Sequence, residues 1–345
     1  MQKFTGKQYL MIDIANSFGL DKETWDVRLQ WFTDNIQAIL AAPFDWMQRA
    51  EEPAQFLAGI NAYEKFLHGH KTGYMCGLDA TASGIQLLSV LSGCVQSAEQ
   101  CNVVNTGKRE DAYTNMHVHM DSLLGHSNQY TRKTIKAAGM THFYGSKAEP
   151  RAAFGEDTPQ LAAFYKTIET LLPGADALNL DLLSLWQPTA LSHDWTLPDG
   201  FDVKIKVMVS QEHAVTFLDR VYAVTSYVNQ AKESGLSMGA NIVHSIDGMV
   251  VREMGRRCNF DATKLTDMHL MLHTETGSKS TLRQQDLELL RLLECTDASG
   301  FMSLVIAEYL DESNLGHLSP AHRQQLITLI ESLPAKPFHL LAIHD

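Results

Sequence analysis

The sequence has few cysteines, no excess of basic charge and no long apolar run. Its five cysteines are scattered and include no CxxC pair, which argues against a zinc ribbon or a disulfide framework and is typical of free thiols. No stretch approaches the ~20 apolar residues that a membrane span needs, and the N-terminus has no secretory signal. We therefore expect no membrane partner.

The charge balance is acidic, with 28 Lys and Arg against 40 Asp and Glu, a net charge of -12. As a bulk property this disfavours nucleic-acid binding. Contact with a polyanion would need local positive charge, bound magnesium or a partner chain. The length of 345 residues, 45% of them hydrophobic, is enough for about two domains with buried cores.

Periodic apolar residues predict a mostly helical α+β chain. Helices are expected over residues 22–41 and 83–91, over 111–145 with a break near 125–128, and in a separate helical unit over 255–335. The last helix of that unit should begin at Ser319–Pro320, where Ser can cap and Pro fits the first turn.

Strands are expected in four places. Residues 73–78 (GYMCGL) form a short apolar run that predicts a buried strand, and residues 201–209 (FDVKIKVMV) alternate between apolar and polar side chains. Residues 214–228 predict a second strand or hairpin arm. The C-terminal FHLLAIHD (338–345) predicts a final apolar strand.

The first segment with candidate chemistry is Asp79, between the predicted strand at 73–78 and the predicted helix at 83–91. Small residues after it permit close approach of a ligand. Alternatively, Asp79 only caps the helix at 83–91.

The second segment is RKTIKAAGMTHFYG (132–145). Its Arg132, Lys136, Met140 and Tyr144 recur every four residues, so they share one stripe of a helix. Arg and Lys suit a polyphosphate, and the phenol offers a flat surface for a base or sugar. A solvated basic face beside a core tyrosine is the alternative.

The third segment is the terminal IHD, in which Asp345 follows an apolar run. Alone it could be a frayed acidic end. Together with Asp79, however, it could bind two Mg²⁺ ions about 3.5–4 Å apart, as in-line phosphoryl transfer requires.

In this order the segments resemble the phage-type single-subunit RNA polymerases of phages and mitochondria. DATASGIQ (79–86) resembles their motif A, residues 132–145 their motif B, VHSIDG (243–248) a further shared segment, and IHD (343–345) the start of motif C. The resemblance implies a right-hand polymerase palm and fingers with a small antiparallel palm sheet. It also implies DNA-directed RNA polymerase activity, with NTPs as substrates and RNA as product.

The resemblance implies roles for single residues. Two Mg²⁺ ions would be bound by Asp79, Asp345 and the backbone carbonyl of Ala80, with His344 supporting the strand turn. The nucleotide would be contacted by Arg132, Lys136, Met140, Tyr144 and Tyr113. Lys136 would also donate a proton to pyrophosphate, and Tyr144 would close the site. The nucleic acid would be contacted by His244, Ser245 and Gly145.

Ribose selection is expected from two of these positions. Related DNA polymerases carry a bulky Glu where this chain has Gly84, so the 2′-hydroxyl has room, and Tyr144 can hydrogen-bond it.

The alternative functions for the chain are a DNA polymerase of that related family, a two-metal nuclease and a non-catalytic binding subunit. A nuclease would have no use for the stripe at 132–144.

By resemblance, residues 1–105 comprise a helical segment and the first part of the palm. Residues 106–243 would form the fingers with a shortened specificity hairpin, and residues 244–345 the second part of the palm with an insertion at 255–335. Only about 78 residues precede motif A, so we expect a second subunit, in a heterodimer, to carry the thumb and template-binding elements. We also expect the chain to continue past Asp345 or another chain to complete the palm.

The shortened hairpin predicts weak promoter recognition. We therefore expect an accessory factor for promoter targeting and a DNA template that is single-stranded or melted.

The expected location is the cytoplasm of an infected bacterial host. The pairs His68/His70 and His117/His119 lack supporting ligands for zinc and are expected to be surface residues.

Overall fold

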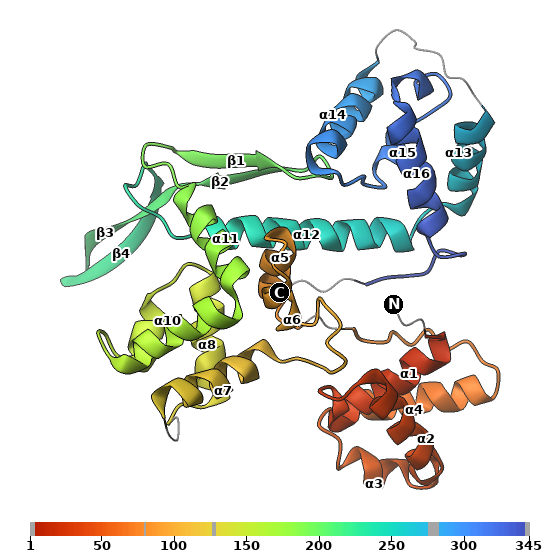
Figure 1. Ribbon diagram of the computed structural model, residues 1–345, viewed down its shortest axis with the longest axis horizontal. Coiled ribbons are helices and arrows are strands. Elements are labelled where there is room, and N and C mark those ends of the chain that lie inside the picture. Colours follow the sequence, from red (N-terminus) through yellow and green to blue (C-terminus); the bar gives the residue numbers. More distant parts are fainter. Residues whose placement is uncertain (1–3, 79–80, 126–128, 275–282, 342–345) are drawn as a thin grey trace. The chain divides into compact units, whose positions relative to one another are not determined.

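The computed structural model describes residues 4–78, 81–125, 129–274 and 283–341. They belong to two compact units, Met1–Arg132 with Ala163–Pro173, and Lys133–Ala162 with Gly174–Asp345 (Figure 1). Helices dominate both, and the strands form two small antiparallel sheets, which confirms the α+β, mostly helical prediction. Within the described residues, no helix is both long and apolar enough to cross a bilayer.

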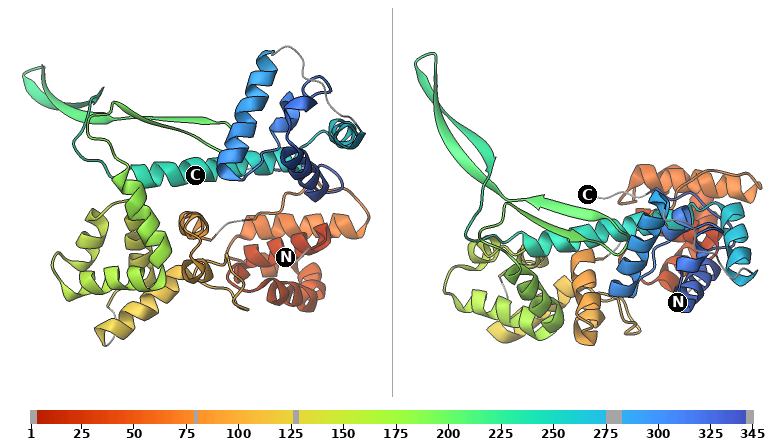
Figure 2. Two further views of the ribbon diagram at one scale, coloured as in Figure 1. Left: turned by 45° about the horizontal axis from the view of Figure 1, so that its top comes forward. Right: turned by 90° about the horizontal axis from the view of Figure 1, so that it is seen from above.

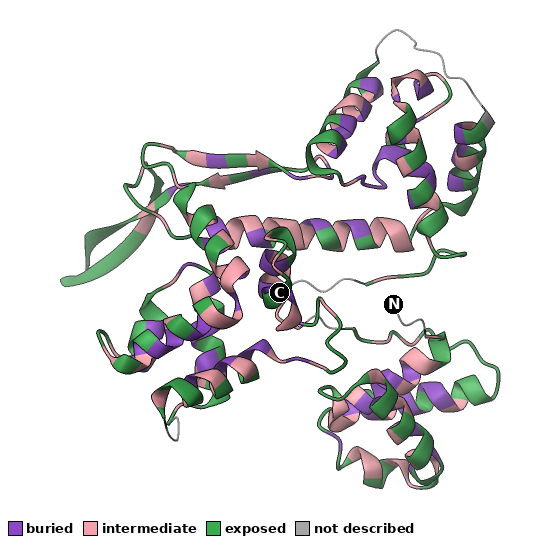
Figure 3. Ribbon diagram, in the orientation of Figure 1, coloured by how far each residue is buried: buried purple, intermediate pink, exposed green. Residues whose placement is uncertain are grey.

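The first unit is helical. Its elements are α1 (Gly6–Ala15), η1 (Asn16–Leu20), α2 (Trp25–Ala41), α3 (Pro43–Met47), α4 (Pro53–Leu67), α5 (Ser83–Leu91), α6 (Val95–Glu99), α7 (Ala112–Leu124) and most of α10 (Pro159–Leu171). The Thr24 side chain caps α2, and Phe32, Ile36 and Ile39 face a core shared with α1 and α4 (Figure 3). The helices predicted over 22–41 and 83–91 are thus confirmed.

The predicted strand at 73–78 is wrong, because these residues have no strand partner and are mostly exposed. The segment is instead held by Asp13 of α1. The Asp13 carboxylate accepts hydrogen bonds from the Tyr74 hydroxyl (2.6 Å) and the Gly77 amide (2.8 Å). A buried side chain therefore satisfies the backbone group that a neighbouring strand would have paired.

The second unit contains both sheets. Its helices up to the last strand are α8 (Arg132–Phe143), α9 (Ala148–Phe154) and α11 (Pro173–Ser184). Strand β1 (Ser192–Thr196) pairs with β2 (Asp202–Lys206), and β3 (Met208–Phe217) with β4 (Arg220–Asn229). The sequence predicted one continuous strand over 201–209, but the structure divides it into β2 and β3 at Val207. The side chain of Val207 is buried, and its amide donates a hydrogen bond to the Leu191 carbonyl outside the sheet.

The β3–β4 hairpin is a two-stranded ribbon. Leu218 and Asp219 form its turn, and both have positive φ (50° and 57°), the geometry that matches the twist of a two-residue hairpin. The second strand predicted over 214–228 therefore includes the turn itself. Most side chains of both strands are exposed.

Helix α12 (Met238–Cys258) follows the strands in the second unit. It runs beside β1 and β2 (Figure 2). Leu197, Val203 and Met249 form a small core between sheet and helix. Asp199, in the β1–β2 turn, is fully buried at its side chain and pairs with Arg252 (2.9 Å) and Arg256 (3.1 Å) of α12.

The helical character predicted for residues 255–335 is confirmed, and within the second unit these residues form a helical unit that follows α12. It comprises α13 (Ala262–Thr274), α14 (Gln284–Ser299), α15 (Ile306–Tyr309), η2 (Leu315–His317) and α16 (Pro320–Ser332) around one apolar core. Ser319 caps α16 as predicted, accepting from the His322 amide. Buried Glu253 of α12 anchors this unit, accepting from the Ser303 hydroxyl (2.7 Å) and the Leu304 amide (2.9 Å).

The predicted C-terminal strand is wrong over 338–341, which form no strand; its remaining residues lie outside the described ones. Phe338 instead donates its amide to the Cys258 carbonyl at the end of α12. An apolar run marks burial or contact, and it becomes a strand only where another backbone pairs with it.

Asp199→Asn should lower the free energy of unfolding by about 2–4 kcal/mol, since it leaves Arg252 without its buried counter-charge and Arg256 with Glu253 (3.5 Å) alone. Burial alone would raise the pKa of Asp199, but the hydrogen bonds and charges of Arg252 and Arg256 lower it below its ordinary value. The stabilisation is therefore present above the ordinary carboxyl pKa and lost as pH falls through the lowered one.

Urea unfolding at pH 7 and at acid pH measures both effects. Asp194→Asn is the matched control, because Asp194 lies in the same sheet with a half-exposed side chain 3.8 Å from Lys204. Equal stability of the two variants at pH 7 would contradict the assigned importance of the Asp199 pairs.

Candidate nucleotide site

The residues predicted to bind metal, Asp79, Ala80 and Asp345, and the supporting His344, lie outside the described residues. The described chain resumes at Thr81. Ala82 holds the N-cap position of α5 in a left-handed conformation (φ 56°) and gives no side-chain cap. A left-handed alanine costs about 1–2 kcal/mol, so the surrounding contacts must hold this turn in place.

Those contacts tie the start of α5 to the loop before α7. Thr81 Oγ1 accepts from the Asn102 amide (3.2 Å), and Gln86 of α5 donates to the Cys101 carbonyl (2.7 Å). Asn102 in turn exchanges two hydrogen bonds with the Glu110 backbone (2.7 and 2.8 Å). The segment that resembles motif A is therefore linked, through Thr81 and Gln86, to the loop that ends at Glu110, the residue before Asp111. Gly84, the second residue of α5, is half-buried there.

Asp111 joins α7 to α8. Its carboxylate caps α7 through the amides of Tyr113 and Thr114 and also pairs with Arg132, whose Nε lies 3.0 Å from Oδ2. Burial would raise the pKa of Asp111, but the hydrogen bonds from Thr114 and Arg132 outweigh it and lower the pKa. The guanidinium predicted to bind triphosphate is thus held by a charged carboxylate, beside buried Tyr113.

Helix α8 exposes the predicted stripe. Arg132, Lys136, Met140 and Tyr144 are all exposed. The opposite side of the helix is buried, through Ile135, Ala138, Gly139 and Phe143. The cations and the phenol are therefore presented outward by a helix whose orientation is fixed by its apolar side.

Gly145 ends α8. Its amide donates to the His142 carbonyl (2.8 Å) and the Ser146 amide to the Thr141 carbonyl (2.9 Å), the two bonds of a Schellman motif. Gly145 has φ +82°, and a Cβ there would lie 2.4 Å from the Leu236 carbonyl oxygen. Only glycine fits, and Tyr144 is consequently held at the helix end.

Tyr144 contacts the start of α12. Its ring meets that of His244 edge-on, with centroids 5.2 Å apart, and both side chains are exposed. Ser245 is half-buried; its hydroxyl donates to the Ile242 carbonyl (2.7 Å) and accepts from the Trp195 indole (3.0 Å). The structure thus brings Tyr144, Gly145 and His244 together, whereas Ser245 already serves the contact between β1 and α12.

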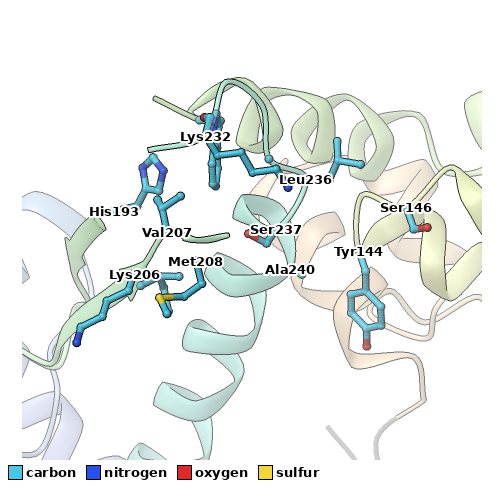
Figure 4. Close-up of a pocket in the computed structure, with 13 residues that line it drawn as sticks. Tyr144, Ser146, His193, Lys206, Val207, Met208, Lys232, Leu236, Ser237 and Ala240 are labelled. Atoms are coloured by element: carbon cyan, nitrogen blue, oxygen red, sulfur yellow. The ribbon is translucent and has the colours of Figure 1, made fainter. Parts of the chain in front are cut away.

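A pocket of about 500 Å³ opens beside Tyr144. Figure 4 shows the side chains that line it, from α12, from the sheets and from the loops, including Tyr144 and Ser146 just after α8. His193 is buried there, stacks near Trp186 (centroids 4.6 Å apart) and has no hydrogen-bond partner for Nε2 among the described residues. Lys206 and Lys232 add positive charge to the lining.

The sequence did not single out His193, Trp186 or Lys232. No spacing links them, because they come from three separate segments that meet only in the folded unit. Of the histidine pairs considered for zinc, His68 and His70 are exposed, whereas His117 and His119 are half-buried. His117 hydrogen-bonds with the Tyr130 carbonyl (2.9 Å), and His119 with the Thr167 hydroxyl (2.9 Å).

A family model described as DNA-dependent RNA polymerase matches residues 3–153. Residues 3–153 are thus similar to DNA-dependent RNA polymerases, over somewhat less than half of the chain. The match includes motif A, Tyr113 and the whole stripe of α8 up to Gly145. His244 and Asp345 lie beyond it, so for them the assignment to this family's motifs rests on resemblance alone.

Three fungal proteins are similar to the chain. The mitochondrial DNA-directed RNA polymerase of Schizosaccharomyces pombe is 26% identical over 163 residues, 41% of this chain and 14% of that protein. A probable DNA-directed RNA polymerase of Neurospora crassa is 30% identical over 38% of the chain and 15% of its own length. The mitochondrial DNA-directed RNA polymerase of Neurospora crassa is 27% identical over 41% and 12%.

The chain thus spans 12–15% of the length of these phage-type polymerase relatives. Two of the three are mitochondrial proteins of fungi. The predicted location in the cytoplasm of an infected bacterial host is therefore wrong.

Gly145→Ala should destabilise the second unit by about 2–4 kcal/mol, because left-handed φ disfavours alanine and the new methyl meets a backbone carbonyl. Gly255→Ala, inside α12, is the control: a Cβ there has nothing within 4 Å, and alanine should gain up to about 1 kcal/mol. Urea unfolding of both variants measures this. A neutral Gly145→Ala would show that the close approach to Leu236 is not required.

Proposed function

We propose that this chain is a catalytic part of a DNA-directed RNA polymerase, which transfers nucleotides to RNA on a DNA template by a two-magnesium mechanism. The observation that carries the proposal is the outward stripe of α8, with two cations, an apolar residue and a phenol ending at an obligatory glycine. It lies wholly inside the segment that matches the polymerase family.

The stripe suits an incoming NTP. Arg132 can grip phosphate oxygens in bidentate fashion, and Lys136 acts as a point charge one turn further along. In the structure Arg132 is paired with Asp111. A triphosphate would therefore exchange one anionic partner for another, and Asp111 would keep the guanidinium oriented while the site is empty of nucleotide. Lys136 would donate a proton to the departing pyrophosphate.

The magnesium ligands in this proposal are Asp79, the Ala80 carbonyl and Asp345. Two carboxylates and a carbonyl are the hard oxygen donors that Mg²⁺ prefers together with water and substrate phosphates. The ions would neutralise charge on the attacking and leaving oxygens. The network from Thr81 to Glu110 would hold the turn that presents Asp79 beside the arginine on α8.

Tyr144 and Gly84 would select ribose. The Tyr144 ring is fixed on one side by His244 and by the end of α8, which leaves its hydroxyl to meet the sugar. Met140 would lie against the base, and Tyr113 would support Asp111. His244, Gly145 and Ser245 would face the nucleic acid, with Ser245 acting chiefly through Trp195.

The division into palm (1–105 and 244–345) and fingers (106–243) belongs to the same proposal. So does a second subunit that supplies the thumb and template-binding elements, and an accessory factor that directs the enzyme to a melted or single-stranded promoter. These parts are separable from the chemistry, because incorporation of nucleotides can be measured with and without a partner chain.

Asp79→Asn should reduce template-directed incorporation of labelled NTP on a primed single-stranded DNA by at least about 100-fold, because it removes a metal ligand from the reacting centre. Asp26→Asn, on exposed α2 surface, should keep full activity. Each protein is assayed alone and with a candidate partner. Full activity of Asp79→Asn would overturn the metal assignment. Activity of the wild-type chain alone would contradict only the proposed need for a second subunit.

Tyr144→Phe should lower the preference for NTP over dNTP by about tenfold, which is what the loss of one hydrogen bond of ~1.4 kcal/mol amounts to. Competing incorporation of labelled NTP and dNTP measures the preference directly. Tyr222→Phe, on the exposed face of β4, is the matched control. An unchanged ratio for Tyr144→Phe would remove the phenol from ribose selection.

A further inference from the structure

A cluster of side chains able to bind a metal lies in the helical unit after α12 and includes no residue of the proposed polymerase site. His269 and His273 are one turn apart on α13, and Glu331 comes from α16. His269 Nε2 lies 3.3 Å from Glu331 Oε1 and 3.4 Å from His273 Nε2. One atom from each of the three side chains can be chosen so that all lie within 4.8 Å of one another.

Hydrogen bonds among the three side chains cannot all form at once. An imidazole nitrogen offers one in-plane position, which holds either a proton or a lone pair. His269 Nε2 therefore cannot donate to Glu331 and accept from His273 at the same time. A cation bound by all three side chains would remove this conflict, because each side chain could then offer it a lone pair.

Two of the three separations in the cluster fit a particular kind of cation, and the third is no more than 4.8 Å. With bonds of about 2.0–2.1 Å, the ligands of a tetrahedral zinc ion lie about 3.3–3.4 Å apart. The two closest separations in the cluster, 3.3 and 3.4 Å, have this length. Two histidines at i and i+4 with one carboxylate also form a ligand set typical of zinc, whereas Mg²⁺ prefers oxygen donors alone.

We propose that His269, His273 and Glu331 bind a zinc ion that links α13 to α16, with water as the fourth ligand on the exposed side. The two helices already pack through buried Leu272 and Leu326, and Arg323 of α16 donates to the Leu272 carbonyl (3.0 Å). The ion would bind at the solvent edge of that contact. It would join helices that lie more than forty residues apart in the chain and stabilise the unit that Glu253 holds on α12.

The test uses the full chain, freed of metal by chelation and dialysis. Isothermal titration with ZnCl₂ should show saturable binding of one ion, and millimolar MgCl₂ should not displace it. The melting temperature should rise by several degrees as zinc saturates the site, since a ligand that binds only the folded state stabilises it. Each of His269→Gln, His273→Gln and Glu331→Gln should weaken binding at least about tenfold.

His70→Gln and Glu312→Gln are the matched controls, as both side chains are exposed and lie outside the cluster; they should bind zinc as the wild type does. Because the chain has five free cysteines, the Co²⁺-loaded wild type is also measured by absorption spectroscopy. Tetrahedral d–d bands without thiolate charge transfer support the site.

Equal zinc affinity in wild type and His273→Gln, thiolate charge-transfer bands or the absence of saturable binding would overturn the proposal. Near-UV circular dichroism checks the fold of each variant. If a variant does not fold, the wild-type Co²⁺ spectrum decides between imidazole–carboxylate and thiolate ligands.

Discussion

Buried negative charge has to be paired, and the second unit is organised around this requirement. Two buried carboxylates, Asp199 and Glu253, meet three arginines on one side of α12, and Arg256 lies between them, 3.1 Å from one and 3.5 Å from the other. Asp199 fixes the β1–β2 hairpin, and Glu253 fixes the helical unit through its hydroxyl and amide donors. Removing Asp199 would leave Arg252 without a counter-charge, and removing Glu253 would leave Arg257 without one, while Arg256 would keep a single partner. The hairpin, the helix and the helical unit therefore depend on one another.

Local signals predicted the helices well. Apolar periodicity, the capping serine at 319 and the break that begins at Gly125 all act within one or two turns, so the sequence alone contains the reason for each element. The strands were predicted less well. Residues 73–78 and 338–341 are apolar enough to suggest strands, but pairing depends on a distant backbone, and Asp13 or Cys258 supplies the partner instead.

In the candidate site, too, some features follow from local sequence spacing and others depend on tertiary contacts. The stripe on α8 follows from four-residue spacing and is exposed in the structure. The pairing of Arg132 with Asp111, the fit of Gly145 against Leu236 and the burial of His193 depend on tertiary contacts between segments with no shared spacing. The i, i+4 spacing of His269 and His273 was visible in the sequence, but nothing there connects them to Glu331, which lies 58 residues further along the chain.

The β3–β4 ribbon bears on how the protein behaves in concentrated solution. Each of its strands has one hydrogen-bonded neighbour among the described residues, and Phe217, Val221, Tyr222 and Tyr227 are exposed on it. Edges of this kind act as templates for strands of other molecules. Glu212, Asp219 and Arg220 interrupt the apolar surface and oppose such stacking. Solubility of the chain therefore depends on a few charged side chains along one ribbon, and replacing them would promote self-association without disturbing either core.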